Sequence, residues 1–334
     1  MGYHLSILDQ APVIEGASNA LTLLRTVELA QLAEKLGYKR FWVSEHHHSH
    51  EVASSSPEVL VSYILAKTNK IRVGSGGVML SHYSPYKVAE NFNVLTNLAG
   101  NRVDLGVGKA PGGLPLATAA LQYGVSESID NDFNERLRLL KGFIENSLPE
   151  EDRFAKLEVT PTTEIAPEII LLGGSVSSAE YAGQLGFTYV FAQFINSDKQ
   201  TLIDAIAAYK KHAPKGKFGV AFAVIAAKDE ASAHTYAEGH EIYKVHLASG
   251  RTLTLTTKEA AEDYGKQSGE AFEVKRYEAN ILSGTPSKIK ETFDHYYELG
   301  VTEFILHTPI KNHEARRMSY ELLSPKKLLS AVTV

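Results

Sequence analysis

The sequence contains no cysteine among its 334 residues. This absence excludes disulfide bridges, thiolate nucleophiles and cysteine-ligated metals, and it is typical of a reducing compartment. The sequence also lacks any run of about 18 apolar residues that could span a membrane, and its start, MGYHLSILDQAP, has no basic region followed by an apolar one. We therefore expect a soluble cytoplasmic protein without a membrane segment.

Excess positive charge is absent as well. The formal net charge is −5 and the pI is about 6.2, whereas proteins that bind nucleic acid usually present a basic face. With 44% hydrophobic and 22% charged residues, the composition is that of an ordinary globular protein. The charge balance argues against nucleic acid as a partner and favours small molecules.

A repeated junction is the clearest sign of how the chain is organised. Four times a helical pattern ends at a glycine and an apolar strand pattern follows within a few residues. A glycine just past a helix end supplies a left-handed cap, so each copy indicates a helix-to-strand loop. The copies are EKLGYKRFWV (34–43), NLAGNRVDLGV (97–107), GQLGFTYVF (183–191) and YELGVTEFIL (297–306).

Strand and helix patterns alternate along the whole chain, which predicts a parallel α/β architecture. Eight strand-helix units favour a (β/α)8 TIM barrel that forms a single domain over residues 1–334, with an open doubly wound sheet as the alternative. The predicted strands are 3–8, 40–44, 71–78, 102–107, 168–172, 188–194, 218–226 and 302–307. The predicted helices are 19–36, 57–68, 85–98, 132–146, 177–185, 198–212, 286–299 and 314–323.

Residues 227–285 are too many for one barrel connection, so we interpret them as an insertion between strand 7 and its helix. The pattern predicts helices over 230–248 and 258–265 around the polar turn at 249–251. At this position the insertion would lie over the carboxyl ends of the strands, which suggests an active-site lid. A packing or dimerisation element is the alternative interpretation.

The second strand ends in Ser44-Glu45-His46-His47-His48-Ser49-His50. This cluster fits metal ligands, but barrel metal sites gather ligands from several strands, and the other strand ends offer no second histidine or aspartate cluster. A catalytic base, or a hydrogen-bond donor to a polar cofactor ring, is the preferred interpretation for His46 and Glu45. We therefore predict no metal site.

Three further strand ends carry groups suited to a cofactor. Glycines in Gly74-Ser75-Gly76-Gly77 let the backbone approach a ligand closely, and Gly108-Lys109 places one cation after bare backbone. The segment Gly173-Gly174-Ser175-Val176-Ser177-Ser178 opens a helix with hydroxyls and free amides, which suits an anion. Tight turns, a surface lysine and a simple helix cap are the plain structural alternatives.

Lys109 and the helix start at Ser175 follow neighbouring strands of the predicted barrel, so together they suit one phosphate monoester. The chain has no GxxxxGK[ST] loop, and no GxGxxG follows its first strand. A mononucleotide such as FMN therefore fits better than a nucleoside triphosphate or NAD.

Several of these segments together resemble the bacterial luciferase-like flavin monooxygenases over nearly the whole chain. They are Ser44 to His47, Gly74 to Gly77, Gly100-Asn101-Arg102 with Gly106, Ser175 to Ala182, and the C-terminal Thr308-Pro309-Ile310 with Asn312 to Arg316. The resemblance implies that His46, beside Glu45, is the catalytic histidine and that the Gly76-Gly77 bond is cis. It implies a cofactor site formed by Ser75, Gly76, Gly77, Gly108, Lys109, Gly174, Ser175 and Ser178.

The same resemblance implies the function: oxidation of a small organic substrate by O2 and reduced FMN, which a separate flavin reductase supplies. Luciferase has a cysteine where this chain has Gly108, so we do not expect light emission. The alternatives are a deazaflavin-dependent oxidoreductase, a non-catalytic flavin-binding protein and a metal-dependent barrel hydrolase. A homodimer is the commonest symmetric assembly. Candidate substrate contacts are Tyr123, Tyr243, His246 and Arg251.

Overall fold

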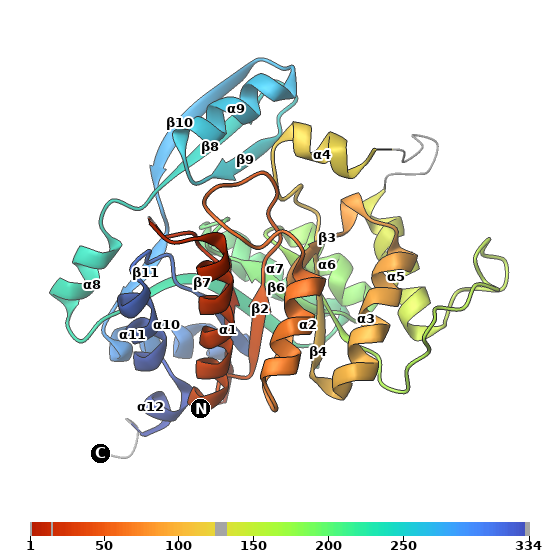
Figure 1. Ribbon diagram of the computed structural model, residues 1–334, viewed down its shortest axis with the longest axis horizontal. Helices are drawn as coiled ribbons and strands as arrows, with labels where there is room; N and C mark the ends of the chain where they lie inside the picture. The colour runs from red at the N-terminus through yellow and green to blue at the C-terminus, as the bar shows by residue number, and fades with distance from the viewer. Residues whose placement is uncertain (1, 15, 124–131, 331–334) are drawn as a thin grey trace.

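The computed structural model describes residues 2–14, 16–123 and 132–330 (Figure 1). Eight parallel strands form a closed barrel, because β7 pairs with both β6 and β12 and thereby joins the two ends of the sheet. This confirms the predicted TIM barrel and makes the open-sheet alternative wrong. The barrel strands are β1 (His4–Asp9), β2 (Arg40–Val43), β3 (Arg72–Met79), β4 (Val103–Gly108), β5 (Glu168–Gly173), β6 (Thr188–Ala192), β7 (Phe218–Ala226) and β12 (Glu303–His307).

Helices cover the outside of the barrel, and all eight predicted ones are present within one or two residues of their predicted bounds. Two shorter helices and two 3₁₀ turns accompany them. The predicted helices are α1 (Asn19–Leu36), α2 (Pro57–Lys67), α3 (Pro85–Ala99), α5 (Phe133–Glu145), α6 (Val176–Leu185), α7 (Lys199–His212), α10 (Pro286–Glu298) and α11 (His313–Leu322). The additional elements are α4 (Pro115–Leu121), α12 (Pro325–Ser330), η1 (Leu80–His82) and η2 (Gly100–Arg102). No described helix is long and apolar enough to cross a membrane.

The glycine junctions end helices as predicted. Gly37 and Gly186 follow α1 and α6 in the left-handed region, with φ of 85° and 75°. The N–H of each donates to carbonyls of the preceding turn, which satisfies acceptors that a helix end leaves free. Gly100 and Gly300 also have positive φ, at 62° and 100°.

The insertion differs in part from the prediction. The predicted helix over 230–248 is wrong beyond Ala237, because α8 (Glu230–Ala237) ends there and β8 (Glu241–Leu247) follows. In β8, the side chains of Tyr243, Val245 and Leu247 pack in a small core, and the residues between them face away from it. Such alternation with a period of two favours a strand. The remaining elements are β9 (Thr252–Leu255), α9 (Lys258–Ser268), β10 (Phe272–Glu278) and β11 (Ile281–Gly284).

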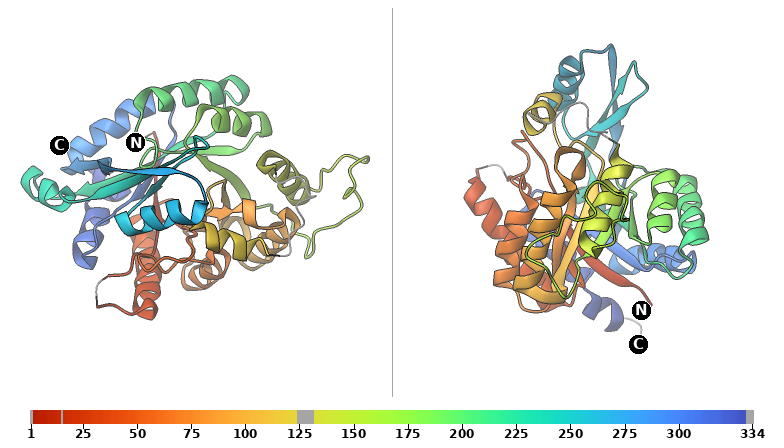
Figure 2. Two further views of the ribbon diagram at one scale, coloured as in Figure 1. Left: turned by 90° about the horizontal axis from the view of Figure 1, so that it is seen from above. Right: turned by 90° about the vertical axis from the view of Figure 1, so that its right-hand side faces the viewer.

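These segments build a small unit above the barrel. Strands β10, β8 and β9 form an antiparallel sheet, and β11 adds to the carboxyl-terminal half of β7. Seen from above, α9 and this sheet lie across the carboxyl ends of the barrel strands (Figure 2). The unit is fastened to the loop after β4, since Leu114 packs in its core and the Leu116 amide donates to Gln267 at 3.1 Å.

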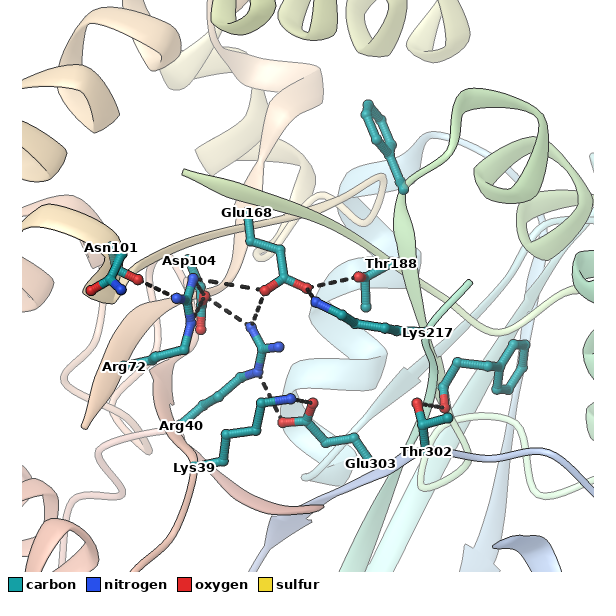
Figure 3. Close-up of polar contacts among 12 residues, drawn as sticks. Lys39, Arg40, Arg72, Asn101, Asp104, Glu168, Thr188, Lys217, Thr302 and Glu303 are labelled. Atoms are coloured by element: carbon teal, nitrogen blue, oxygen red, sulfur yellow. Dashed lines mark hydrogen bonds and ion pairs between the residues drawn. The ribbon is translucent and has the colours of Figure 1, made fainter. Parts of the chain in front are cut away.

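A charged network closes the opposite end of the barrel (Figure 3). Arg40, at the start of β2, is 1% exposed and donates to Asp104 at 2.9 Å, Glu168 at 3.0 Å and Glu303 at 2.9 Å. Lys39, Arg72 and Lys217 surround the same carboxylates. We call these seven residues the floor network. They balance charges that would be costly to bury alone.

An apolar layer lies directly above the floor network inside the barrel. It consists of Leu8, Trp42, Ile170, Val190, Ala221 and Ile305. The Trp42 indole N–H donates to Asp104 at 2.9 Å and so joins this layer to the floor. Because side chains alternate between the two faces of a strand, β2 places Arg40 and Trp42 inside the barrel and Phe41 and Val43 in the outer core.

Replacing Arg40 by Met should destabilise the protein by roughly 3–5 kcal/mol, because buried carboxylates would be left without their cation. The free energy of urea unfolding measures this. Lys87→Met is the matched control, since Lys87 pairs with Glu90 on an exposed helix face, and it should change the free energy by less than about 1 kcal/mol. A similarly small effect for Arg40→Met would show that the floor network is dispensable.

The floor network should also make the free energy of unfolding depend on pH in the acidic range. Burial raises the pKa of Glu168, but Arg40 and Lys217 outweigh it and lower the pKa to about 2. A carboxyl with a lowered pKa stabilises the fold above its unfolded pKa of about 4.3, and this contribution is lost as the pH falls toward 2. Glu168→Gln should therefore flatten the fall in unfolding free energy between these pH values, and an unchanged slope would contradict the expectation.

Candidate active site

A cavity of about 500 Å³ lies at the carboxyl ends of the barrel strands. All eight barrel strands contribute to its lining, which is how active sites of TIM barrels are built. Its base is the apolar layer, through Leu8, Trp42, Val190, Ala221 and Ile305. The volume is in the usual range for small-molecule sites. The cavity is therefore the candidate active site.

Glycines of β3 line one wall of the cavity, as predicted for Gly76 and Gly77. A Cβ atom at Gly77 would lie 2.7 Å from Leu172 Cδ1 and 2.8 Å from the Gly106 carbonyl oxygen. A Cβ at Gly76 would lie 2.8 Å from Leu8 Cδ1. Both positions therefore have no room for a side chain. The bond between them is cis, as the resemblance implies.

Ser75 lies behind the cavity wall, and its predicted contact with a cofactor stays a prediction. Its side chain is completely buried, and its hydroxyl donates to the Gly106 carbonyl at 2.8 Å. It is not among the residues that line the cavity. The hydroxyl connects β3 to β4 where the register between these strands shifts, so its role in the structure is to hold the cavity wall.

Gly108 and Lys109 line the cavity at the end of β4. Lys109 is exposed, and no described group pairs with its ammonium. Three hydrogen bonds hold the loop that carries it: Ser81 donates to the Lys109 carbonyl at 3.3 Å, His82 contacts the Pro111 carbonyl at 2.7 Å, and the His47 amide donates to the Gly112 carbonyl at 2.7 Å. The cation is thus held at the cavity wall without a protein counter-ion among the described residues.

The start of α6 forms the neighbouring wall, with Gly174, Ser175 and Ser178 in the lining. Ser175 caps the helix, its hydroxyl accepting from the Ser178 amide at 3.2 Å and lying 2.9 Å from the Ser178 hydroxyl. The Tyr189 hydroxyl, at 2.7 Å, holds Ser178 from behind. The amides of Val176 and Ser177 lie in the first turn, where a helix offers no acceptor. Hydroxyls, amides and the helix dipole therefore converge on one point.

His46 lies just beyond the carboxyl end of β2 and outside the lining itself. Its Nδ1 is 3.1 Å from the Ser44 hydroxyl. Burial lowers the pKa of His46 to about 4; His47 adds to this shift, while the charge of Glu45 opposes it. His46 is therefore a neutral imidazole at neutral pH, with one nitrogen able to donate and one able to accept.

Glu45 is completely buried and does not line the cavity. Its carboxylate binds three groups: the Tyr83 hydroxyl at 2.7 Å, the Met79 amide at 2.9 Å and the His47 ring at 2.7 Å. Because Met79 is a lining residue, this carboxylate holds β3 and the histidine loop in place. In this structure Glu45 positions these segments, and its predicted catalytic role stays a prediction.

The histidine cluster after β2 spreads apart in the structure. His47 turns toward Glu45, while His48 and His50 are exposed. No group of three or more potential metal ligands is arranged around a common point among the described residues. The geometry therefore adds no support to the metal-hydrolase hypothesis.

Several lining residues were missed by the sequence reasoning. Trp42 and Ile305 occupy strand positions that read as ordinary core, and Phe194 lies in a loop just past β6. Asn134 and Tyr181 come from α5 and α6, where the Tyr181 hydroxyl donates to the Asn134 carbonyl at 3.1 Å. The alternation of Arg40 and Trp42 along β2 is the signal that could have identified the inward face of that strand.

The four suggested substrate contacts do not line the cavity. Tyr123 is 92% exposed, and Tyr243 packs against the core of the insertion. His246 is 3.0 Å from the Thr252 hydroxyl, and Arg251 pairs with Glu270 at 2.9 Å. In this conformation they belong to the insertion or to the surface.

A family model described as luciferase-like monooxygenase matches residues 1–303. The chain belongs to this family. A luciferase-like monooxygenase is an oxidoreductase, and the barrel with a cavity at the carboxyl ends of its strands suits that activity. The predicted family resemblance is thereby confirmed.

Individual relatives cover nearly the entire luciferase-like chain. N-acetyl-S-alkylcysteine monooxygenase of Bacillus subtilis is 44% identical, covering 96% of this chain and 97% of its own length. The crystal structure of apo-MsnO8 is 31% identical, with a TM-score of 0.77 and 98% of each chain covered. The oxygenating constituent of 3,6-diketocamphane monooxygenase from Pseudomonas putida, solved with FMN, shares the fold at 19% identity, with a TM-score of 0.69 and 98% of both chains covered.

Replacement by alanine should lower stability at one glycine of this luciferase-like cavity and leave it unchanged at another. Gly77→Ala forces a methyl group against Leu172 and the Gly106 carbonyl, and overpacking of this kind costs about 1–3 kcal/mol. Gly108→Ala is the matched control, because a Cβ there meets only Met79 Sδ at 3.9 Å. Thermal unfolding should show a lower Tm for Gly77→Ala alone; equal Tm values for the two variants would refute the steric argument.

Proposed function

We propose that this protein is an FMN-dependent monooxygenase that uses O2 and reduced FMN, supplied by a separate reductase, to oxidise a small thioether. One observation carries the proposal: an apolar cavity of about 500 Å³ ends in a serine-capped helix start and a cation that has no partner within the described part of the chain. This arrangement suits a planar ring joined to a phosphate.

The polar end of the cavity fits a phosphate monoester. Lys109 and Ser175 follow β4 and β5, which are hydrogen-bonded neighbours, and both line the cavity. The hydroxyls of Ser175 and Ser178 and the free amides of the first turn of α6 can donate to phosphate oxygens. Lys109 supplies a point charge, where an arginine would offer two parallel hydrogen bonds. We call Lys109, Ser175 and Ser178 the phosphate clamp.

The other end of the cavity fits the flavin ring. Trp42, Met79, Leu172 and Ile305 line it with apolar atoms, and the glycines of β3 leave the wall flat because they add no side chain. A tricyclic ring would replace water on these surfaces, which favours binding. The residues present therefore fit FMN.

When bound, reduced FMN would react with O2 and transfer one oxygen atom to the substrate, while the other leaves as water. The chain contributes a water-poor cavity through its apolar lining, which protects reactive groups from side reactions. It also contributes His46, a neutral imidazole that can donate one hydrogen bond and accept another. Glu45 holds the loop after β2 and the end of β3 in place around these groups.

The name of one relative supports a substrate class: the relative that is 44% identical is an N-acetyl-S-alkylcysteine monooxygenase. We propose a thioether of an acylated amino acid as the substrate. The cavity supports this assignment because its upper wall, from Phe194, Ile195 and Ala110, is mostly apolar and can accept an alkyl group. The insertion, residues 227–285, would serve as the lid over this end.

The activity is tested directly by supplying reduced FMN and O2 with a panel of N-acetyl-S-alkylcysteines and simple ketones. We expect oxygen-dependent oxidation of the thioethers, with one atom of ¹⁸O2 recovered in the product. Reduced deazaflavin F420 in place of FMN should give no turnover. Turnover with F420 alone, or flavin binding without any substrate oxidation, would establish one of the alternative functions.

The phosphate clamp predicts selective losses of affinity. Ser175→Ala and Lys109→Met each remove a contact to the phosphate, worth about 1.5–3 kcal/mol for a charge-assisted hydrogen bond. The Kd for FMN should therefore rise by at least about tenfold, whereas the Kd for riboflavin, which lacks the phosphate, should stay the same. Flavin fluorescence quenching measures both constants.

Two control variants separate the clamp from general damage. Ser18→Ala removes an equivalent helix cap from α1, where Ser18 accepts from the Leu21 amide at 3.1 Å, so it should alter stability without altering FMN affinity. Lys109→Arg keeps the charge and should restore most of the FMN affinity. Equal losses for FMN and riboflavin in the clamp variants would place the phosphate elsewhere.

A further inference from the structure

A side-chain hydrogen bond joins the insertion to the loop after β6. Asn280 lies between β10 and β11, and its amide group donates to the Gln193 carboxamide oxygen at 2.6 Å. Gln193 is only 4% exposed, so water has little access to replace this donor, and a buried acceptor is costly to leave without one. The contact therefore fastens the insertion to the barrel on the side of β6.

The loop that begins at Gln193 forms part of the cavity wall. Gln193 lies between Ala192 and Phe194, and these two neighbours line the cavity together with Ile195. The amides of Gln193 and Phe194 donate to the Ala221 carbonyl at 3.0 Å and 3.3 Å, and Phe194 packs against the apolar layer. A displacement of Gln193 would therefore move this wall. We call Phe194 and Ile195 the apolar wall.

The other end of the loop is held beside the phosphate clamp. The Asn196 side-chain amide donates to the Gly174 carbonyl at 2.8 Å, and Gly174 lines the cavity directly before Ser175. The apolar wall is therefore a two-residue segment between two anchored side chains. One anchor, Asn196, reaches the start of α6, and the other, Gln193, reaches the insertion.

The position of Asn280 is set by the fold of the insertion. The Ala279 amide donates to the His240 carbonyl at 2.9 Å, which joins the segments that lead into β8 and out of β10. On the other side of Asn280, Ile281 is in register with Ala223 of β7. Because backbone contacts hold the chain on both sides, the Asn280 side chain is presented to Gln193 from a fixed point.

We propose that Asn280 is a positioning residue for substrate binding, which acts through Gln193 to hold the apolar wall where the apolar group of the substrate packs. This inference rests on the proposed function, in which that group is the S-alkyl chain of a thioether. Asn280 is not among the residues that line the cavity. The insertion thereby fixes the shape of the substrate end of the cavity through one side chain.

The kinetic test uses Asn280→Leu, which keeps the size of the side chain but cannot donate a hydrogen bond. The KM for N-acetyl-S-alkylcysteines should rise about tenfold, because the apolar wall is in place in only a fraction of the molecules. The kcat should stay the same, as expected when only binding is lost. The Kd for FMN should also stay the same, because the phosphate clamp has its own anchor at Asn196.

Substrate preference separates a positioned wall from general damage. An S-propyl group has two more methylene groups than an S-methyl group, and their burial against the apolar wall should favour the longer substrate in kcat/KM by about tenfold in the wild-type protein. In Asn280→Leu this preference should fall toward one. An unchanged preference in the variant would overturn the proposal.

A double variant tests whether the two residues act through one contact. Gln193→Leu also removes a 3.4 Å contact to the Ser197 carbonyl, so it should have at least the effect of Asn280→Leu, and adding Asn280→Leu to it should change nothing further. Additive losses would contradict the inference. Ser268→Ala is the matched control, since its hydroxyl donates to the Gly265 carbonyl at 2.7 Å within the insertion, and it should leave KM and substrate preference unchanged.

Hydrogen exchange followed by mass spectrometry tests the wall without turnover. In Asn280→Leu, amides of residues 193–197 should exchange at least about tenfold faster, because their local opening becomes easier, while those of α6 exchange as in the wild-type protein. Unchanged exchange in this segment, or faster exchange with an unchanged KM, would overturn the proposal. If the wild-type protein oxidises no thioether, the proposed function fails, whereas faster exchange confined to residues 193–197 still supports Asn280 as the residue that holds the wall.

Discussion

The guanidinium of Arg40 binds three carboxylates that come from three other strands of the barrel. Asp104 belongs to β4, Glu168 to β5 and Glu303 to β12. These strands are distant in sequence, so the contacts are possible only when the sheet has closed. A buried cation of this kind is stable only with its partners in place. The floor network thereby ties barrel closure to a small set of charged side chains (Figure 3).

The floor network supports the side chains that line the cavity. Trp42 hydrogen-bonds to Asp104 beneath it and presents its ring to the cavity above. Ile305 follows Glu303 on the inward face of β12 in the same way. Because alternate side chains of each strand point into the barrel, the interior has three layers. The floor network lies at one end, the apolar layer lies in the middle, and the cavity opens at the carboxyl ends of the strands. A shift of one residue in either strand would turn these side chains outward.

Contacts to backbone amides and carbonyls hold the loops at the mouth of the barrel in place. The Glu45 carboxylate fixes Met79 and His47, and the loop after β4 is held by carbonyl contacts at Lys109, Pro111 and Gly112. The Lys109 ammonium, which pairs with no group among the described residues, and the capped start of α6 therefore lie on one wall. An anionic group is what such a wall lacks, which is why FMN is central to the proposed function.

Local sequence patterns were enough to predict the strand-helix alternation, the eight barrel strands, the glycine caps at Gly37 and Gly186, and the grouping of Gly76, Gly77, Lys109 and Ser175 at one end of the sheet. These follow from local periodicity and from the rule that parallel strands end on the same side. The direction of individual side chains, in contrast, depends on how the elements pack together. Glu45 and Ser75 bind neighbouring backbone groups, and the lining residues Trp42 and Phe194 were missed, because barrel closure determines which face of each strand points inward. The strand β8 was mistaken for helix for a related reason: its alternating residues pack in a core that forms only when α9 folds over them.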